Sequence, residues 1–169
     1  VLSVVFVPNR LLIDQMGKDL RAALPADVYT VASVAGLDAI TDDAAATART
    51  ATAIGAAWTA AAAAGRKLII VSTIQSEFKL VHAQAQDLIP EVGLMLLDEA
   101  HNALGGEGGQ ACAAVFDAAP SSFRKKMMAP LVRSRLGCVR RVLLTASPTV
   151  GFCTEAHVAG RCFYLLTKA

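Results

Sequence analysis

Aromatic residues and long hydrophobic runs are scarce in this chain. Only 5% of its 169 residues are aromatic, with one Trp and two Tyr, so we expect no aromatic cluster on which nucleic-acid bases could stack. The longest stretch without a charge, residues 50–65, has 16 residues and is mostly Ala and Thr. A membrane-spanning helix needs about 20 strongly apolar residues, and we therefore expect no membrane partner.

The cysteine patterns that hold metals or form disulfide frameworks are missing as well. The four cysteines are Cys112, Cys138, Cys153 and Cys162, and they show neither a CxxC spacing nor a nearby pair of histidines. We expect free thiols in a reducing compartment. This predicts an intracellular protein, in the cytoplasm or the nucleus.

Acidic residues are absent from residues 118–154. This segment carries seven Lys and Arg residues, although the net charge of the whole chain is only +2. Two interpretations stay open for it: a phosphate-binding surface, or the solvated face of an outer helix.

Small and β-branched apolar side chains are abundant, and the chain is 54% hydrophobic, which is enough for one sizeable core. Short apolar runs that predict buried strands alternate with helical patterns. Strands are expected at residues 1–7, 28–33, 67–72, 92–97, 139–144 and 161–166, and helices at 11–24, 42–64, 76–88, 110–118 and 122–136. The alternation predicts an α/β fold with a parallel, doubly wound sheet in a single domain.

Two of the expected helices have distinctive sequences. Of the 21 residues from Ala44 to Ala64, 13 are Ala, the best helix former, while Gly55 weakens the pattern. In the helix at 76–88, Ser76 is a candidate N-cap, and the spacing places Phe78, Val81 and Ala85 on one face.

Polar clusters follow four of the predicted strands: PNR at 8–10, STIQS at 72–76, DEAHN at 98–102 and TASPT at 145–149. Parallel α/β sheets place their chemistry at the carboxyl ends of strands. An acidic pair there, Asp98–Glu99, is typical of a nucleotide–metal site. The first carboxylate holds Mg²⁺, often through water, and the second polarises the attacking water. The other interpretation is a pair of loop acids that cap the next helix.

Together these segments resemble the first RecA-like domain of superfamily 2 helicases and translocases. The similarity is to the DEAH-type branch, which includes type III restriction subunits and excision-repair helicases. LMLLDEAHN at 94–102 resembles motif II, the Walker B sequence, and LLTASPT at 143–149 resembles motif III. VVFVPNRLLIDQ at 4–15 resembles motif Ia, and IIVSTIQS at 69–76 resembles the segment between motifs Ia and II. The resemblance covers nearly the whole chain and implies a partial RecA-like (P-loop NTPase) fold.

The resemblance implies ATP and Mg²⁺ as cofactors and a role for each matching residue. Asp98 would coordinate Mg²⁺, mainly through water, and Glu99 would be the general base that activates the hydrolytic water. His101 would hydrogen-bond towards Thr145 and Ser147, which couple the nucleotide site to a second RecA-like domain. Ser147 stands where the family usually has Thr but keeps the hydroxyl.

DNA or RNA is the partner that the resemblance implies, and a second group of residues would contact it. Backbone amides at a helix N-terminus and a hydroxyl suit phosphate oxygens and read no bases, so binding would be independent of sequence. The residues are Pro8, Asn9, Arg10, Thr73 and Gln75. The simpler interpretation is that they form ordinary strand-to-helix turns and a helix cap.

The family's P-loop, GxxxxGK[ST], which holds the nucleotide phosphates, does not occur in these residues. Gly17-Lys18 is followed by Asp19, and Gly105–Gly109 contains no Lys. We expect residues 1–169 to be an incomplete helicase ATP-binding domain 1 that is inactive alone, with the P-loop strand upstream and the second RecA-like domain downstream. A missing strand would leave unpaired backbone groups in the sheet unless its neighbours close up.

Two other hypotheses stay open. The missing P-loop favours a degenerate helicase-like module that binds nucleic acid or a protein partner without hydrolysing ATP. The remaining hypothesis is an unrelated α/β enzyme in which the DEAH sequence is a coincidence.

Overall fold

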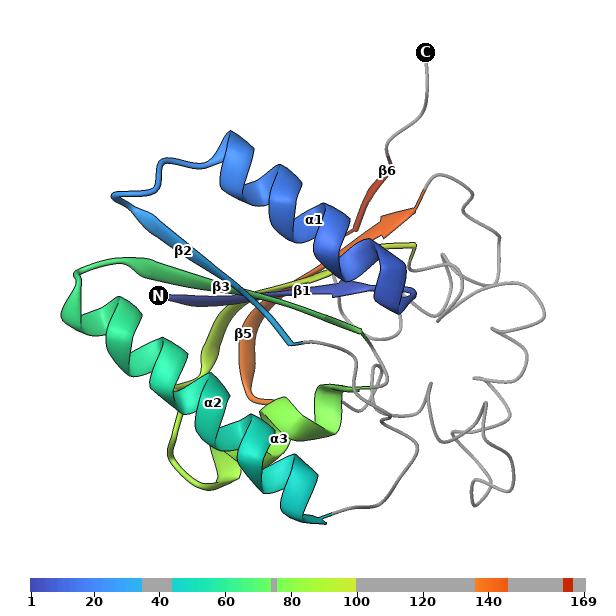
Figure 1. Ribbon diagram of the computed structural model, residues 1–169. Helices are drawn as coiled ribbons and strands as arrows, with labels where there is room; N and C mark the ends of the chain where they lie inside the picture. Colours follow the sequence, from blue (N-terminus) through green and yellow to red (C-terminus); the bar gives the residue numbers. More distant parts are fainter. Residues whose placement is uncertain (35–43, 74–75, 100–135, 146–162, 166–169) are drawn as a thin grey trace, which may run out of the picture. The chain divides into compact units, whose positions relative to one another are not determined.

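The computed structural model describes residues 1–34, 44–73, 76–99, 136–145 and 163–165, which Figure 1 shows in colour. Within these ranges the strands and helices follow in the order that the sequence predicts. They are β1 (Leu2–Val7), α1 (Arg10–Ala23), β2 (Tyr29–Ser33), α2 (Ala44–Ala63), β3 (Lys67–Thr73), α3 (Glu77–Ala85), β4 (Val92–Leu97), β5 (Cys138–Thr145) and β6 (Phe163–Leu165). The helices expected at 110–118 and 122–136 lie outside the described residues.

The strands form one sheet with the order β2-β3-β1-β4-β5-β6. β1 and β2 each pair with β3 in parallel, and β5 pairs with β6 in parallel. The predicted α/β fold with a parallel, doubly wound sheet is confirmed. Each described strand is hydrogen-bonded to its neighbours in this order. Just before β5, the Gly137 carbonyl also accepts from the Val92 N–H at the start of β4, at 2.9 Å. Among the described residues, no gap therefore separates neighbouring strands in this order.

The chain divides into two compact units. The first contains residues 1–95 and 136–140, and the second contains residues 96–135 and 141–169. In the described residues, the first unit holds β1, β2, β3, the three helices and the first parts of β4 and β5. The second holds the ends of β4 and β5 together with β6.

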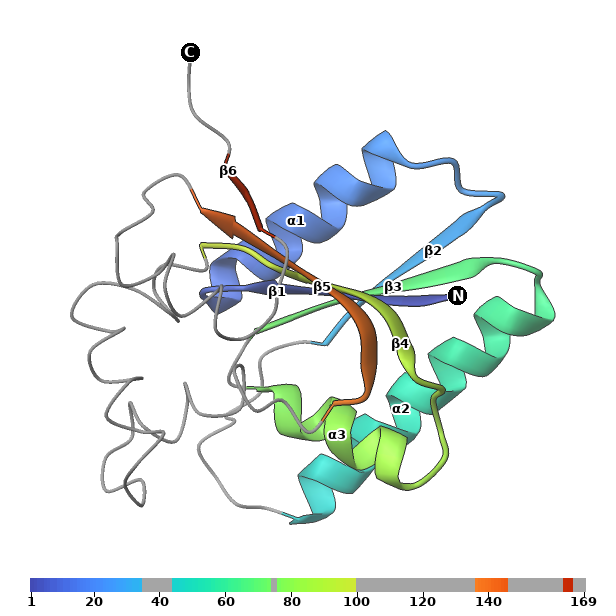
Figure 2. The same ribbon diagram turned by 180° about the vertical axis from the view of Figure 1, so that it is seen from behind.

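In the first unit, α1 covers one face of the sheet, and α2 and α3 cover the other (Figures 1 and 2). β1 and β3 are buried on both faces, because helices lie above and below them. This explains why both strands are continuous apolar runs without polar alternation. Their core side chains are Leu2, Val4, Val5, Phe6, Val7, Leu68, Ile69, Ile70 and Val71.

β2 is the edge strand at one end of this order. The Val28 carbonyl accepts from Lys67 and the Val34 N–H donates to Val71, so the even-numbered residues of this segment bond to β3. Successive backbone groups alternate in direction along a strand, and the Val31 carbonyl therefore faces the free edge. There it accepts a hydrogen bond at 3.3 Å from the guanidinium of Arg21 on α1.

α3 differs from its sequence-based prediction in length and in orientation. It ends at Ala85, because Asp87 adopts a positive φ of 55° that no helix can continue. The face that carries Phe78 is not the buried one: Phe78 is 40% exposed, whereas Leu80 and Ala83 are fully buried. Ser76 is the N-cap residue as predicted, but its side chain makes no capping hydrogen bond.

α2 closely approaches the segment after α3 at Gly55. A Cβ atom at Gly55 would lie 2.9 Å from the Cβ of Leu88, closer than two carbon atoms can pack without a shift of the backbone. Gly55 has a low helix propensity, but it permits the contact of the Ala-rich helix with the segment after α3.

Gln84 on α3 joins two other parts of the first unit. Its Nε2 donates to the carbonyls of Pro90 and Gly137 at 3.1 and 3.2 Å, and its Oε1 accepts from the Gly137 N–H at 2.6 Å. Gly137 directly precedes β5 and Pro90 lies just before β4. One side chain thus ties the helix to the starts of two neighbouring strands.

Gly55→Ala should lower the free energy of unfolding by about 1–3 kcal/mol, the usual cost of overpacking. Helix propensity alone predicts the opposite sign, since Ala is favoured over Gly by about 1 kcal/mol. Urea unfolding of the chain followed by circular dichroism measures the difference. Ala56→Gly, at the exposed neighbouring position, reports propensity alone. A Gly55→Ala variant more stable than the parent would show that the close approach does not constrain the helices.

Gln84→Ala should destabilise the chain by about 1–3 kcal/mol, because it leaves the partly buried Gly137 N–H without its acceptor. Gln86→Ala removes the same kind of side chain from an exposed position at the end of α3 and should stay within about 0.5 kcal/mol of the parent. Thermal and urea unfolding compare the two. Equal effects of the two substitutions would contradict the bridging role of Gln84.

Candidate functional site

The acidic pair Asp98–Glu99 directly follows β4. β4 is an interior strand between β1 and β5, and its Val92, Met95 and Leu97 side chains are buried. The prediction that the pair stands at the carboxyl end of a buried, interior strand is confirmed. Both acids are half-buried, so the turn is partly open to solvent.

Glu99 has an unusual backbone conformation. Its φ is +50°, in the left-handed region that costs a non-glycine residue roughly 1–2 kcal/mol. The turn is supported by Asp98, whose Oδ1 accepts from the Glu99 N–H at 3.0 Å. Strained residues of this kind concentrate at functional sites, where the surrounding structure holds them.

The predicted coupling residues are only partly within the described structure. Thr145 is the last residue of β5 and pairs with Leu165 of β6. His101 and Ser147 lie outside the described residues. The proposed hydrogen bonds among these three side chains therefore stay a prediction.

The PNR turn begins α1. Asn9 is the N-cap, in an extended conformation (φ −148°, ψ 168°), and its side chain accepts from the Leu12 N–H at 3.2 Å. Asn9 therefore caps α1, as the simpler interpretation of this turn predicts. Asn9 and Arg10 are both exposed. The first turn of α1 contains no acidic residue, so its amide groups and Arg10 offer a positive surface to a phosphate.

Thr73 lies beside this turn but inside the protein. The register pairs Val7 with Thr73, so the PNR turn and the end of β3 are neighbours. Thr73 is only 3% exposed, and its hydroxyl donates to the Ser76 Oγ at 3.2 Å. The Thr73 hydroxyl thus bonds within the protein. Among the predicted nucleic-acid-binding residues that the structure describes, the accessible ones are those of the PNR turn. Gln75 lies outside the described residues.

Two buried charged residues on α3 were missed by the sequence-based interpretation. Glu77 and Lys79 are both 2% exposed, and the Lys79 Nζ lies 5.8 Å from the centre of the Phe78 ring. Nothing in their spacing signals burial, since charged residues beside an apolar face normally point to solvent. They lie on the buried side of α3 together with Leu80 and Ala83.

The candidate residues fall into the two compact units. Pro8, Asn9, Arg10 and Thr73 belong to the first, and Asp98, Glu99 and Thr145 to the second. The joining of the two groups into one site stays a prediction.

None of the helices in the described residues is both long and apolar enough to cross a membrane. No family model matches the chain, and neither the curated proteins nor the solved structures contain a match to it.

Proposed function

We propose that this chain is part of the first RecA-like domain of an ATP-dependent nucleic-acid helicase or translocase. The observation that carries the proposal is the Asp98–Glu99 turn at the end of an interior strand, within the sequence LMLLDEAHN. ATP hydrolysis would drive movement along DNA or RNA. The proposal requires a P-loop and a second RecA-like domain elsewhere in the same polypeptide.

The donor set at the turn fits Mg²⁺. Magnesium in nucleotide sites keeps several waters and uses one or two carboxylates together with the phosphates. The described residues contain no group of three or more His, Cys, Asp or Glu side chains that could enclose a metal. A hydrated ion needs only one carboxylate, which Asp98 would supply. Bound Mg²⁺ would neutralise charge that develops on the transferred phosphate.

Asp98 and Glu99 would have different roles in ATP hydrolysis. Asp98 uses Oδ1 to hold the turn, and its second carboxylate oxygen can accept from a metal-bound water. Glu99 accepts the proton of the attacking water as a general base. Its left-handed φ sets the direction in which the side chain leaves the backbone, immediately after a rigid strand.

Nucleic acid would be held through its phosphates at the exposed PNR turn. Asn9 occupies the cap, the helix amides and Arg10 supply positive charge, and Pro8 ends the strand. Because these groups contact no base edges, the affinity should not depend on nucleotide sequence.

The second candidate function is a degenerate helicase-like module. A degenerate module would bind nucleic acid or a protein partner without hydrolysing ATP. Nucleic-acid binding by the complete polypeptide, together with no ATP turnover under any nucleic-acid stimulation, would favour it.

In the complete polypeptide, Glu99→Gln should lower ATP turnover by about 100-fold or more, the usual contribution of a general base. ATP affinity should change little, because the amide keeps the size of the side chain. A phosphate-release assay and nucleotide-binding titrations measure the two quantities. Glu91→Gln, at an exposed position before β4, is the control. Turnover that survives Glu99→Gln would mean that Glu99 is not the base.

Binding of single-stranded oligonucleotides should weaken steeply with salt, with a log–log slope of about 0.7 per neutralised phosphate. Arg10→Ala should lower this slope by about one phosphate contact, roughly 0.7. Lys18→Ala, an exposed change on the same helix, should leave it unchanged. Fluorescence anisotropy with unrelated sequences measures both the slope and the affinity. A flat salt response, or discrimination between sequences above about tenfold, would overturn phosphate-directed binding.

A further inference from the structure

The start of α3 has an inverted burial pattern. Glu77 and Lys79 are both 2% exposed, whereas the Phe78 between them is 40% exposed. A large aromatic side chain gains free energy when it is buried, while a charged one is almost never fully buried unless it is paired. Folding energetics alone would therefore favour the opposite arrangement. Local departures of this kind concentrate at sites that serve a function.

Phe78 and the PNR turn are held at the same end of the first unit. β1 and β3 pair in parallel up to Val7 and Thr73, and each strand leads into a helix, α1 after β1 and α3 after β3. The Thr73 hydroxyl donates to the Ser76 Oγ at 3.2 Å, which ties the start of α3 to the end of β3. Both helices therefore begin at the carboxyl ends of neighbouring strands.

The Phe78 ring has an inner and an outer face. The Lys79 Nζ lies over the ring, 5.8 Å from its centre, and the Lys79 side chain is buried. The ring face towards the ammonium is therefore turned to the protein, and the exposed part of the ring includes the opposite face. A flat ring can have a cation at one face and a stacked partner at the other.

We propose that the outer face of Phe78 stacks on a base of single-stranded nucleic acid whose phosphates lie at the PNR turn. This inference rests on the proposed function, from which it takes the phosphate contacts of Asn9 and Arg10. Proteins that bind single strands combine a positive surface for the backbone with aromatic side chains on which bases stack. Every base has a flat face, so stacking keeps the binding independent of sequence. In a duplex the bases are already stacked and paired, so Phe78 would favour single strands.

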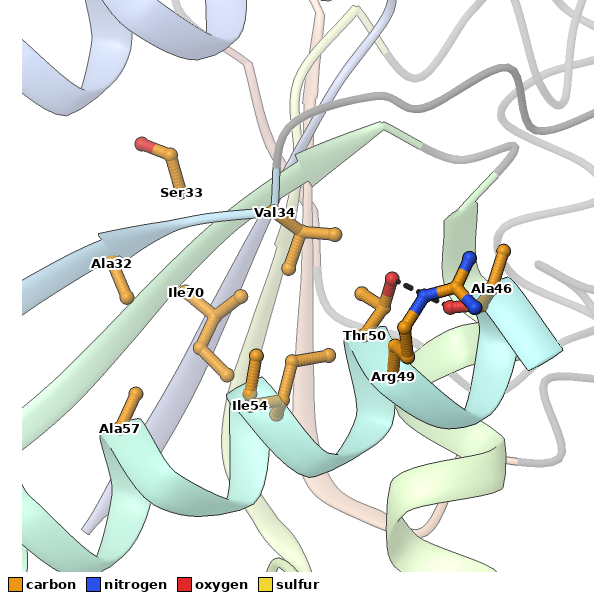
Figure 3. Close-up of a pocket in the computed structure, with 10 residues that line it drawn as sticks. Ala32, Ser33, Val34, Ala46, Arg49, Thr50, Ile54, Ala57 and Ile70 are labelled. Atoms are coloured by element: carbon orange, nitrogen blue, oxygen red, sulfur yellow. Dashed lines mark hydrogen bonds between the residues drawn. The ribbon is translucent and has the colours of Figure 1, made fainter.

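A base could instead enter the cavity of about 400 Å³ between α2 and the strands β2 and β3 (Figure 3). Ile54 and Ile70 are among the residues that line this cavity, whereas Phe78 and the PNR turn are not. The cavity is therefore a separate place for an apolar group. Ala57→Leu puts a larger side chain into its lining and serves as a control, since stacking on Phe78 should not respond to this change.

The test compares a thymidine oligonucleotide with an abasic strand of the same length, which has the phosphates but no bases. Fluorescence anisotropy measures the binding of both strands to the 169-residue chain. We expect the thymidine strand to bind about 5- to 150-fold more tightly, the range for one stacked base. Phe78→Ala should remove this preference and leave the salt slope unchanged, because stacking neutralises no phosphate. Arg10→Ala should lower the salt slope and keep the preference.

Two further variants at Phe78 separate stacking from a structural role. Phe78→Leu keeps an apolar side chain without an aromatic face and should lose most of the preference, whereas Phe78→Trp should retain it. Circular dichroism checks that each variant is folded, and Phe78→Leu decides if Phe78→Ala is not. Val139→Ala, at an exposed apolar position near the start of β5, is a second control that should bind as the parent does.

The outcomes distinguish the stacking contact from the proposed function. A preference fully retained in folded Phe78→Ala or Phe78→Leu, or equal binding of both strands by the parent chain, would overturn stacking on Phe78 but leave phosphate binding intact. Loss of the preference in Ala57→Leu but not in the Phe78 variants would place the base in the cavity. Absence of binding to either strand would overturn this inference together with the proposed nucleic-acid binding.

Discussion

The parallel pairing of β1 with β3 is the interaction on which the rest of the first unit depends. Its register runs from Leu2 opposite Leu68 to Val7 opposite Thr73, so both strands end at the same level. Because both are buried on two faces, a slip of one residue would exchange every side chain between the α1 face and the α2 face. The position of the exposed PNR turn beside the buried hydroxyl of Thr73 follows directly from this register.

The described strands could be predicted because the residues of each strand identify it without knowledge of its neighbours. A short β-branched run such as VLSVVFV indicates a strand buried on both faces, and Pro8 ends that run. The end of β4 was predictable for the same reason: an apolar run followed at once by two acids identifies a strand that reaches solvent. The placement of Asp98 and Glu99 therefore needed no tertiary information.

Features set by packing could not be predicted. α3 is a helix of 9 residues, too short for its apolar spacing to define a face, and packing instead buried Leu80 and Ala83 and exposed Phe78. In the sequence, Gly55 is only a weak helix former. In the fold it allows a close contact with Leu88, more than thirty residues away, and this contact could not be predicted from the sequence. The left-handed φ of Glu99 and the burial of Thr73 likewise depend on neighbours that local propensity does not describe.

The hydrogen bond from Arg21 to the Val31 carbonyl bears on how copies of this chain meet one another. An edge strand offers a row of unpaired donors and acceptors, and a second chain can extend the sheet by pairing with it. Arg21 donates to the outward-facing Val31 carbonyl in the middle of β2. Its positive charge would also repel the Arg21 side chain of an approaching copy. We therefore expect this one side chain from α1 to disfavour strand addition at this edge.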